Sequence, residues 1–297
     1  MSFEMSSELT ARAELFAAIE GGSEFWTREI TNSGTQAVRE KLLNSGYLAH
    51  KNSAAKISER LATLNGEDVL GQIEKAGAFF LTPDDLEWPA QFTDLSAPPI
   101  ALLIKGERDY LSQLSNSISI VGTRNPTNYG VRIAQDFAAG ACDREWAVIS
   151  GGAIGIDAAA HKGALAAEGL TVAILGGGFN KNYPAVHEKL FAEIVQSGLL
   201  ISEVMPDVHA APHRFLIRNR LIAAISKATV VVEAAFRSGS LRTARDAAEI
   251  FRPVMAVPGP INSPTSEGCH RLIAERCAEL VSSISEVMEL VLPLAVK

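Results

Sequence analysis

The residues best placed to do chemistry lie in three short glycine-rich segments, each directly after a run of apolar residues. Glycine lets a backbone approach a ligand closely and expose its N–H groups, and a helix that follows adds partial positive charge. Each segment therefore suits a phosphate group, although its glycines could equally serve only a tight strand-to-helix turn. The segments are 122–126, 150–157 and 176–181, and their predicted ligand contacts are Arg124, Asn125, Gly151, Gly152, Gly178 and Lys181.

Arg124 is the first candidate for a direct phosphate contact. It lies just past the apolar run Ile118 to Val121, at the edge where ligands bind in an open parallel sheet. A guanidinium there can hold a phosphate with two parallel hydrogen bonds. The competing interpretation is a loop arginine that pairs with a nearby carboxylate.

A second cationic segment interleaves arginines with an aromatic residue. Such a mixture holds a nucleic-acid backbone while a base stacks on the ring. The competing interpretation of Phe215 is a core residue. The predicted contacts in this segment are Arg214, Phe215, Arg218, Asn219 and Arg220.

The three arginines of this segment are not expected to act alike. On a helix, Arg214 and Arg218 share a face, and Arg220 points elsewhere. We therefore expect one arginine to be structural, paired with Glu203 or Glu233, and the others to face a ligand.

No catalytic site is predicted. Asp157 and His161 would lie one turn apart on a helix, and Ser150 lacks the GxSxG turn that exposes a nucleophile. His161 is expected instead to orient the adjoining loop. Neither a Walker loop nor GxGxxG after the first strand is present, so no ATP or dinucleotide cofactor is predicted.

The cysteines favour a reducing compartment, because Cys142, Cys269 and Cys277 form no CxxC pair and no even disulfide framework. Cys269 precedes His270, but the sequence offers no second pair of ligands to complete a metal site, so no metal site is predicted. Residues 1–10 lack a signal-peptide pattern, and no stretch approaches roughly eighteen apolar residues. We therefore expect a cytoplasmic protein with no membrane partner.

The net charge of −7 argues at first against a nucleic-acid partner. Residues 1–117 carry 10 Lys and Arg against 17 Asp and Glu, whereas residues 118–297 carry 17 of each. Within the neutral part, residues 209–252 hold eight basic side chains against three acidic ones. That window is locally basic, although it could also be a solvated helical face.

Short apolar runs alternate with amphipathic helices from residue 118 onward. Because these runs lack polar alternation, they resemble strands covered by helices on both faces. The pattern predicts an α/β fold with a doubly wound, mostly parallel sheet of the extended Rossmann-like kind. The predicted strands are 118–121, 147–149, 172–175, 199–201, 230–232 and 254–257.

The predicted organisation has three parts. Residues 1–76 show helical periodicity broken by glycines and are expected to form a small helical domain. Residues 77–117 are too rich in proline for a helix and are expected to pack on the sheet as a lead-in. Residues 118–297 form the predicted Rossmann-like domain.

At these motifs the sequence resembles the DNA processing protein A family, also called DprA or Smf. Any one motif is weak, but the ordered set is specific. It comprises Trp88-Pro89, Pro98-Pro99, VGTRNPTNYG (121–130), SGGAIGIDAAAH (150–161), GGGFNKNYP (176–184), SE (202–203), FLIRNRLIA (215–223), VVEA (231–234), SGSLRTA (238–244) and VPG (257–259).

The resemblance implies a non-enzymatic protein that binds single-stranded DNA, shields it from nucleases and helps load the RecA recombinase in natural transformation. It implies DNA contacts at Arg124, the turn at Gly178, Arg214, Phe215 and residues 218–220. It also implies a homodimer, with an interface that we expect around Leu272 and Ile273. The family's winged-helix and helix-hairpin-helix signals are not evident in the sequence, so the resemblance does not extend to partner binding by those modules.

Two other classes of protein remain open. Phosphoribohydrolases of the lysine-decarboxylase-like kind would carry PGGxGTxxE near the fifth strand, where this chain has Glu233 to Ser240 without the second glycine and the catalytic glutamate. A sensor of small nucleotides would use the same phosphate pocket. Titration with oligo-dT and with free nucleotides separates the three interpretations.

Overall fold

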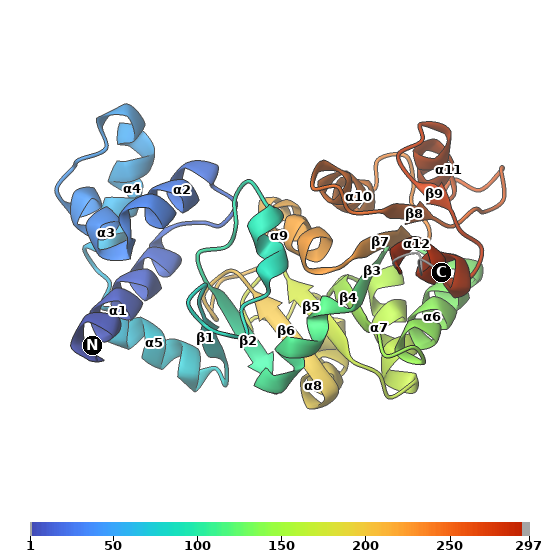
Figure 1. Cartoon of the computed structure of the whole chain (residues 1–297), viewed down its shortest axis with the longest axis horizontal. Helices are drawn as coiled ribbons and strands as arrows, with labels where there is room; N and C mark the ends of the chain where they lie inside the picture. Colours follow the sequence, from blue (N-terminus) through green and yellow to red (C-terminus); the bar gives the residue numbers. More distant parts are fainter. Residues whose placement is uncertain (1, 293–297) are drawn as a thin grey trace, which may run out of the picture.

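The computed structural model describes residues 2–292, with side chains from residue 7. Its first part is a group of helices, seen at one end of the molecule in Figure 1. Leu15, Trp26, Val38 and Leu61 form the centre of their apolar core. The helices are α1 (Ser2–Ala18), α2 (Glu24–Ser33), α3 (Thr35–Leu43), η1 (Leu48–His50), α4 (Lys51–Leu61) and α5 (Gly66–Lys75).

A nine-stranded sheet runs through the rest of the described chain, in the order β1-β2-β6-β5-β4-β3-β7-β8-β9. Strands β3 to β9 pair in parallel, and β1 and β2 are antiparallel additions at one edge. The predicted doubly wound, mostly parallel sheet is thus confirmed. The strands are β1 (Phe79–Leu81), β2 (Leu102–Gly106), β3 (Ser117–Val121), β4 (Ala147–Gly151), β5 (Thr171–Leu175), β6 (Gly198–Ser202), β7 (Ala228–Val231), β8 (Val254–Ala256) and β9 (Glu279–Leu280).

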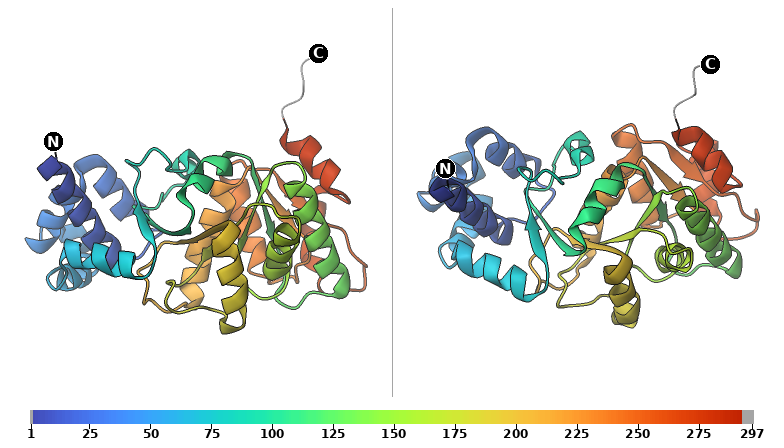
Figure 2. Two further views of the ribbon diagram at one scale, coloured as in Figure 1. Left: turned by 90° about the horizontal axis from the view of Figure 1, so that it is seen from below. Right: turned by 60° about the horizontal axis from the view of Figure 1, so that its bottom comes forward.

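Helices cover both faces of this sheet, as Figures 1 and 2 show. Successive side chains of a strand point to opposite faces, so Ile120 packs with α6 and α7 while Val121 packs with α9 and α10. Both faces of the central strands are therefore apolar, which is why these strands read as unbroken apolar runs. The helices are α6 (Asn128–Cys142), α7 (Ile156–Ala166), α8 (Glu188–Ser197), α9 (Pro212–Ile225), α10 (Ser240–Glu249), α11 (Glu267–Ala274) and α12 (Ile284–Val291).

The predicted lead-in, residues 77–117, joins the sheet instead of only packing on it. Its prolines lie in an irregular middle with the short helix η2 (Ala90–Asp94), and η3 (Arg108–Ser115) leads into β3. The apolar stretches on either side carry no proline and can donate ladder hydrogen bonds. They form β1 and β2, with Ile104 opposite Ile201 of β6.

The N-terminal helices share part of their core with the sheet. Phe16 of α1 and Ile73 of α5 pack in one cluster with Leu103 of β2 and Ala173 of β5. The boundaries drawn at residues 76 and 117 remain predictions, and residues 1 and 293–297 lie outside the described chain.

The order of the parallel strands reverses at β3. The chain moves from β3 through β4 and β5 to β6 on one side, and then crosses by α9 to β7 on the other side. At such a switch point the loops beyond the strand ends diverge and leave a crevice. Among residues 2–292, none of the helices is long and apolar enough to cross a membrane.

Candidate nucleic-acid interface

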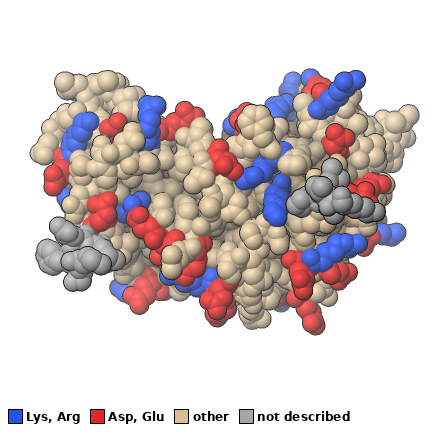
Figure 3. All heavy atoms as spheres, viewed as in Figure 1, with Lys and Arg blue, Asp and Glu red and all other residues tan. Residues whose placement is uncertain are grey.

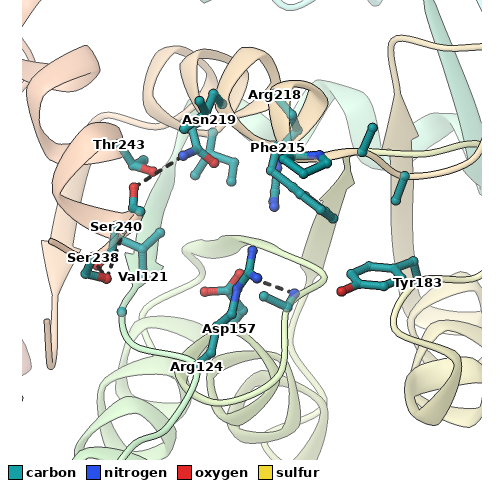
Figure 4. Close-up of a pocket in the computed structure, with 18 residues that line it drawn as sticks. Val121, Arg124, Asp157, Tyr183, Phe215, Arg218, Asn219, Ser238, Ser240 and Thr243 are labelled. Carbon is teal, nitrogen blue, oxygen red and sulfur yellow. Dashed lines mark hydrogen bonds between the residues drawn. The ribbon is translucent and has the colours of Figure 1, made fainter. Parts of the chain in front are cut away.

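A pocket of about 630 Å³ lies at this switch point, beyond the carboxyl end of β3 (Figure 4). Its floor comes from the end of β3 and the turn before α7, and its walls come from α9 and the start of α10. It is lined by Val121, Gly122, Arg124, Ala153, Asp157, Tyr183, Ala210, Ala211, Pro212, Phe215, Leu216, Arg218, Asn219, Ile222, Ser238, Gly239, Ser240 and Thr243.

Arg124 supplies an unpaired cation to this pocket. Its side chain is exposed, and no carboxylate in the described part of the chain forms an ion pair with it. Its guanidinium lies 5.3 Å from the centre of the Phe215 ring. Figure 4 shows Arg124 and Arg218 reaching into the pocket from opposite sides. The competing interpretation of a loop ion pair thus has no partner in the described residues.

Arg218 is a buried cation in the pocket wall. Its Nη1 donates a hydrogen bond to the carbonyl of Ile174 at 2.7 Å, and its Nε has no partner among the described residues. Burial lowers the pKa of Arg218 to about 10, and the charge of Asp157 opposes this effect. Arg218 therefore remains protonated at neutral pH.

Asp157 partly balances that charge. Burial raises the pKa of its carboxyl group, while Arg218, the Ala153 N–H group and Arg124 act in the opposite direction. The backbone N–H of Ala153 donates to Asp157 Oδ2 at 3.3 Å. With one carboxyl group facing two guanidinium groups, the pocket carries a net positive charge that an anion can neutralise.

Phe215 and Tyr183 give the pocket an aromatic edge. The two ring centres lie 5.4 Å apart with planes inclined at 43°. Phe215 rests on the backbone of Gly176, where a Cβ atom would lie only 2.7 Å from the ring. Glycine at position 176 is thus explained by the close approach of this ring. A smaller cavity of about 60 Å³ also borders Phe215 and is lined by Gly152 and Ile154.

The predicted contacts divide by location. Arg124, Phe215, Arg218 and Asn219 line the larger pocket. Asn219 donates through its side-chain amide to the carbonyl of Gly239 at 3.3 Å, which ties α9 to the start of α10. Gly151 lies beneath the guanidinium of Arg218, since a Cβ there would be 1.9 Å from Nη1.

Three other predicted contacts lie away from the pocket lining. Asn125 and Lys181 are exposed. The N–H of Gly178 donates to the carbonyl of Val208 at 2.8 Å, and Met205 and Pro206 cover its Cα. The N–H of Gly178 is therefore engaged by its own chain, and a DNA contact at this turn stays a prediction.

Arg214 and Arg220 both form ion pairs. Arg220 contacts both carboxylate oxygens of buried Glu203, at 2.6 and 2.9 Å, as expected for one structural arginine. Arg214 contacts Glu20 at 2.5 Å and the carbonyl of His209 at 2.7 Å. Although Arg214 and Arg218 lie one turn apart on α9, only Arg218 lines the pocket.

The residues considered for catalysis are held in structural hydrogen bonds. Ser150 is fully buried and donates to the carbonyl of Ile120 at 2.6 Å. His161 contacts Thr171 and the carbonyl of Gly151 through its two ring nitrogens, at 2.8 and 2.9 Å. Burial lowers its pKa to about 4, so it is neutral at pH 7. His161 thus fixes the loop of the second glycine segment, as expected.

Glu233 also has a structural role. It accepts hydrogen bonds from the N–H and hydroxyl groups of Thr127, at 2.8 and 2.7 Å, and from Thr265 at 3.1 Å. These bonds tie the N-cap of α6 to the loop before α11. Within residues 2–292 there is no group of three or more His, Cys, Asp or Glu side chains arranged to hold a metal ion.

Several pocket residues were not predicted as contacts. Tyr183 is half exposed and lies two residues after the third glycine segment, within the motif 176–184, whose aromatic residues could have been weighed with Phe215. Ser238, Ser240 and Thr243 line the pocket from α10 and the loop before it. Their position depends on how α10 packs against α9, which no local pattern in the sequence reveals.

The fold and the pocket define a doubly wound α/β protein with a cationic pocket, bordered by aromatic rings, at its switch point. The family model for DNA recombination-mediator protein A matches residues 79–292, and the chain belongs to this family. The resemblance drawn from the ordered motifs is confirmed.

Curated relatives agree with this assignment. A putative DNA processing protein DprA of Mycobacterium tuberculosis is 45% identical over 235 residues, which are 75% of this chain and 60% of that protein. Protein Smf of Escherichia coli is 40% identical over 224 residues, with 75% of this chain and 59% of that protein covered. The chain thus spans about 60% of the length of these relatives.

Two solved structures share the fold. The structure of DNA processing protein A from Streptococcus pneumoniae matches with a TM-score of 0.74 and 27% identity, over 92% of this chain and all of that chain. The protein from Helicobacter pylori matches with a TM-score of 0.64 and 28% identity, over 72% of this chain and 96% of that chain. The Helicobacter structure describes that protein's single-stranded DNA binding mode.

Proposed function

We propose that the chain binds single-stranded DNA in the pocket at the switch point, with Arg124 holding a phosphate and Phe215 supporting a base. The observation that carries this proposal is the unpaired guanidinium of Arg124, 5.3 Å from a ring that borders the pocket. A cation beside an aromatic ring that borders a pocket is a combination with which proteins hold single strands. The single-stranded DNA binding described for the Helicobacter protein supports the same assignment.

The shape of the site favours a single strand over a duplex. Arg124, Phe215 and Arg218 face one another across a half-open pocket (Figure 4), which a flexible strand can enter with one base turned inward. A duplex read in its major groove would need a protruding helix or ribbon.

We further propose that binding shields the strand from nucleases and assists RecA loading in natural transformation, in the cytoplasm and as a homodimer. Family membership supports these roles.

The expected dimer contact at Leu272 has little support, because Leu272 is only 6% exposed and packs in the core beside α10 residues. We also propose that the chain is not an enzyme, since Ser150, His161 and Glu233 are engaged in structural hydrogen bonds.

A titration with oligo-dT, a duplex of equal length, AMP and ATP tests this function. We expect oligo-dT to bind more tightly than the duplex, and we expect no release of adenine or phosphate from the nucleotides. Equal affinity for the duplex would count against the pocket as a single-strand site. Steady turnover that is lost in Glu233→Gln would support the phosphoribohydrolase interpretation instead.

The ion pair between Glu20 and Arg214 leads to a further prediction. Burial opposes ionisation of Glu20, but hydrogen bonds and charge from Arg214 and His213 hold its pKa below the ordinary value. Glu20→Gln would release Arg214, and a partly exposed pair of this kind is worth up to ~1 kcal/mol. If Arg214 contacts DNA, the affinity for oligo-dT should therefore rise by up to about fivefold, measured by fluorescence anisotropy.

Glu29→Gln is the matched control, because it removes the same charge from α2 within the same helical part. An equal gain in both variants would show a general charge effect and would remove Arg214 from the DNA site.

A further inference from the structure

A second pocket, of about 320 Å³, lies between α10, α11 and the loop that precedes α10. Four arginines line it, and Figure 3 shows Lys and Arg side chains gathered over this part of the molecule. The four are Arg237, Arg242, Arg245 and Arg271. We call this pocket the α10–α11 groove.

The α10–α11 groove carries a net positive charge. Arg242 pairs with Asp246 at 2.6 Å, and Arg271 pairs with Glu275 at 2.5 Å. Arg237 and Arg245 are exposed, and within residues 2–292 neither forms an ion pair with a carboxylate. Two guanidinium groups are therefore available to an anion.

Phe236 adds an exposed aromatic ring to these charges. It is 47% exposed, and the guanidinium of Arg271 lies 4.7 Å from its ring centre. The ring therefore offers part of its surface to a ligand, directly beside a cation. Phe215 with Arg124 shows the same arrangement in the first pocket, at 5.3 Å.

The two pockets adjoin at Ser238. Its side chain lines both of them and hydrogen-bonds to Ser240 at 2.7 Å, at the beginning of α10. From the same helix, Ser240 and Thr243 line the first pocket, whereas Arg242 and Arg245 line the α10–α11 groove. The groove is thus a continuation of the first site around the start of α10.

We propose that the α10–α11 groove is a second subsite for the same DNA strand, in which Arg237 and Arg245 hold phosphates and Phe236 supports a base. This inference rests on the proposed function of the first pocket. A run of phosphates fits two unpaired arginines, and a base fits an exposed ring beside a cation. An acidic peptide would use the arginines but would leave Phe236 without a role.

The test compares two lengths of oligo-dT by fluorescence anisotropy. Site sizes in single-strand binding proteins range over roughly 4–16 nucleotides, so an oligomer of about 5 nucleotides should fill the first pocket and one of about 20 should reach both. In the double variant Arg237→Ala/Arg245→Ala, we expect unchanged binding of the short oligomer and weaker binding of the long one. The log–log salt slope for the long oligomer should flatten by about 1.4, the share of two phosphate contacts.

Phe236→Ala should weaken only the long oligomer, with little change in its salt slope, because no ionic contact is lost. The matched control is Arg28→Ala/Arg132→Ala, which removes two exposed arginines from α2 and α6. This control should bind both oligomers like the parent protein.

The outcomes separate the subsite from the first pocket. If the parent binds neither oligomer, the proposed function fails. If the parent binds both and the double variant matches the control, the function stands and the subsite is wrong. Equal losses of affinity for both oligomers in the double variant would also overturn the subsite, because the groove would then affect the first pocket. A change in the oligomeric state of the double variant, measured by light scattering, would overturn it as well, because the groove would then join two copies of the chain.

Discussion

Replacing Arg124 with alanine is expected to weaken oligo-dT binding by about ten- to more than a hundredfold. Loss of a charge-assisted phosphate contact costs about 1.5 to 3 kcal/mol, which corresponds to that range. The N-terminal part of the chain is acidic, so attraction must come from a local site and not from the overall charge. Arg124 is the exposed cation of that site, whereas the charge of Arg218 is partly balanced by Asp157.

The salt dependence of binding identifies the kind of contact that is lost. Without Arg124, the log–log slope of affinity against salt should flatten by about 0.7, the share of one single-strand phosphate. Arg132→Ala, an exposed arginine on α6, is the charge-matched control and should keep the parent slope. If Arg124→Ala remains folded by circular dichroism and binds within about twofold of the parent, the site does not lie at the end of β3.

The sequence predicted the sheet because its central strands are buried on both faces. Burial on both faces leaves uninterrupted apolar runs such as Ile118 to Val121, which are readable without any knowledge of partners. Strand β2 was missed because its neighbour β6 lies far along the chain and the prolines between β1 and β2 dominate the local pattern. Strand β2 pairs with β1 on one side and with β6 on the other, and its own residues do not reveal either partner.

The glycine segments were located correctly along the sheet edge, but their physical role was only partly predictable. Gly151 and Gly176 make room for Arg218 and Phe215, which come from α9. Gly178 makes room for the backbone of residues 205–206. Since a glycine in a turn can admit a ligand, a side chain or another backbone, the sequence leaves all three open, and only tertiary packing distinguishes them.

The roles of the arginines of α9 were also only partly predictable from the sequence. Helical spacing places Arg214 and Arg218 on one face, but each side chain is long enough to turn away from that face and hydrogen-bond to a nearby carboxylate or carbonyl. Glu20, in the N-terminal helical part, accepts a hydrogen bond from Arg214, although the two residues are 194 positions apart in the sequence. The choice between Glu203 and Glu233 as partner for an arginine likewise required the fold, in which Glu203 holds Arg220 and Glu233 holds two threonines.

Replacing Phe215 with alanine should weaken oligo-dT binding by about five- to 150-fold while leaving the salt slope nearly unchanged. A base that stacks on an aromatic side chain gains about 1 to 3 kcal/mol, and no ionic contact is removed with the ring. The ring borders both cavities and lies between Arg124 and Tyr183. It is therefore accessible to a base and also in contact with a residue that we expect to bind phosphate.

Phe215→Leu separates stacking from packing, because leucine keeps an apolar side chain over Gly176 but has no aromatic face. If Phe215 stacks on a base, Leu and Ala should lose similar affinity, and Phe215→Tyr should retain most of it. If Phe215 mainly fills the space above Gly176, Leu should bind like the parent, and Ala should unfold at a lower temperature. A flattened salt slope in Phe215→Leu would show instead that the ring acts by holding Arg124 in place, since the lost affinity would then come from a phosphate contact.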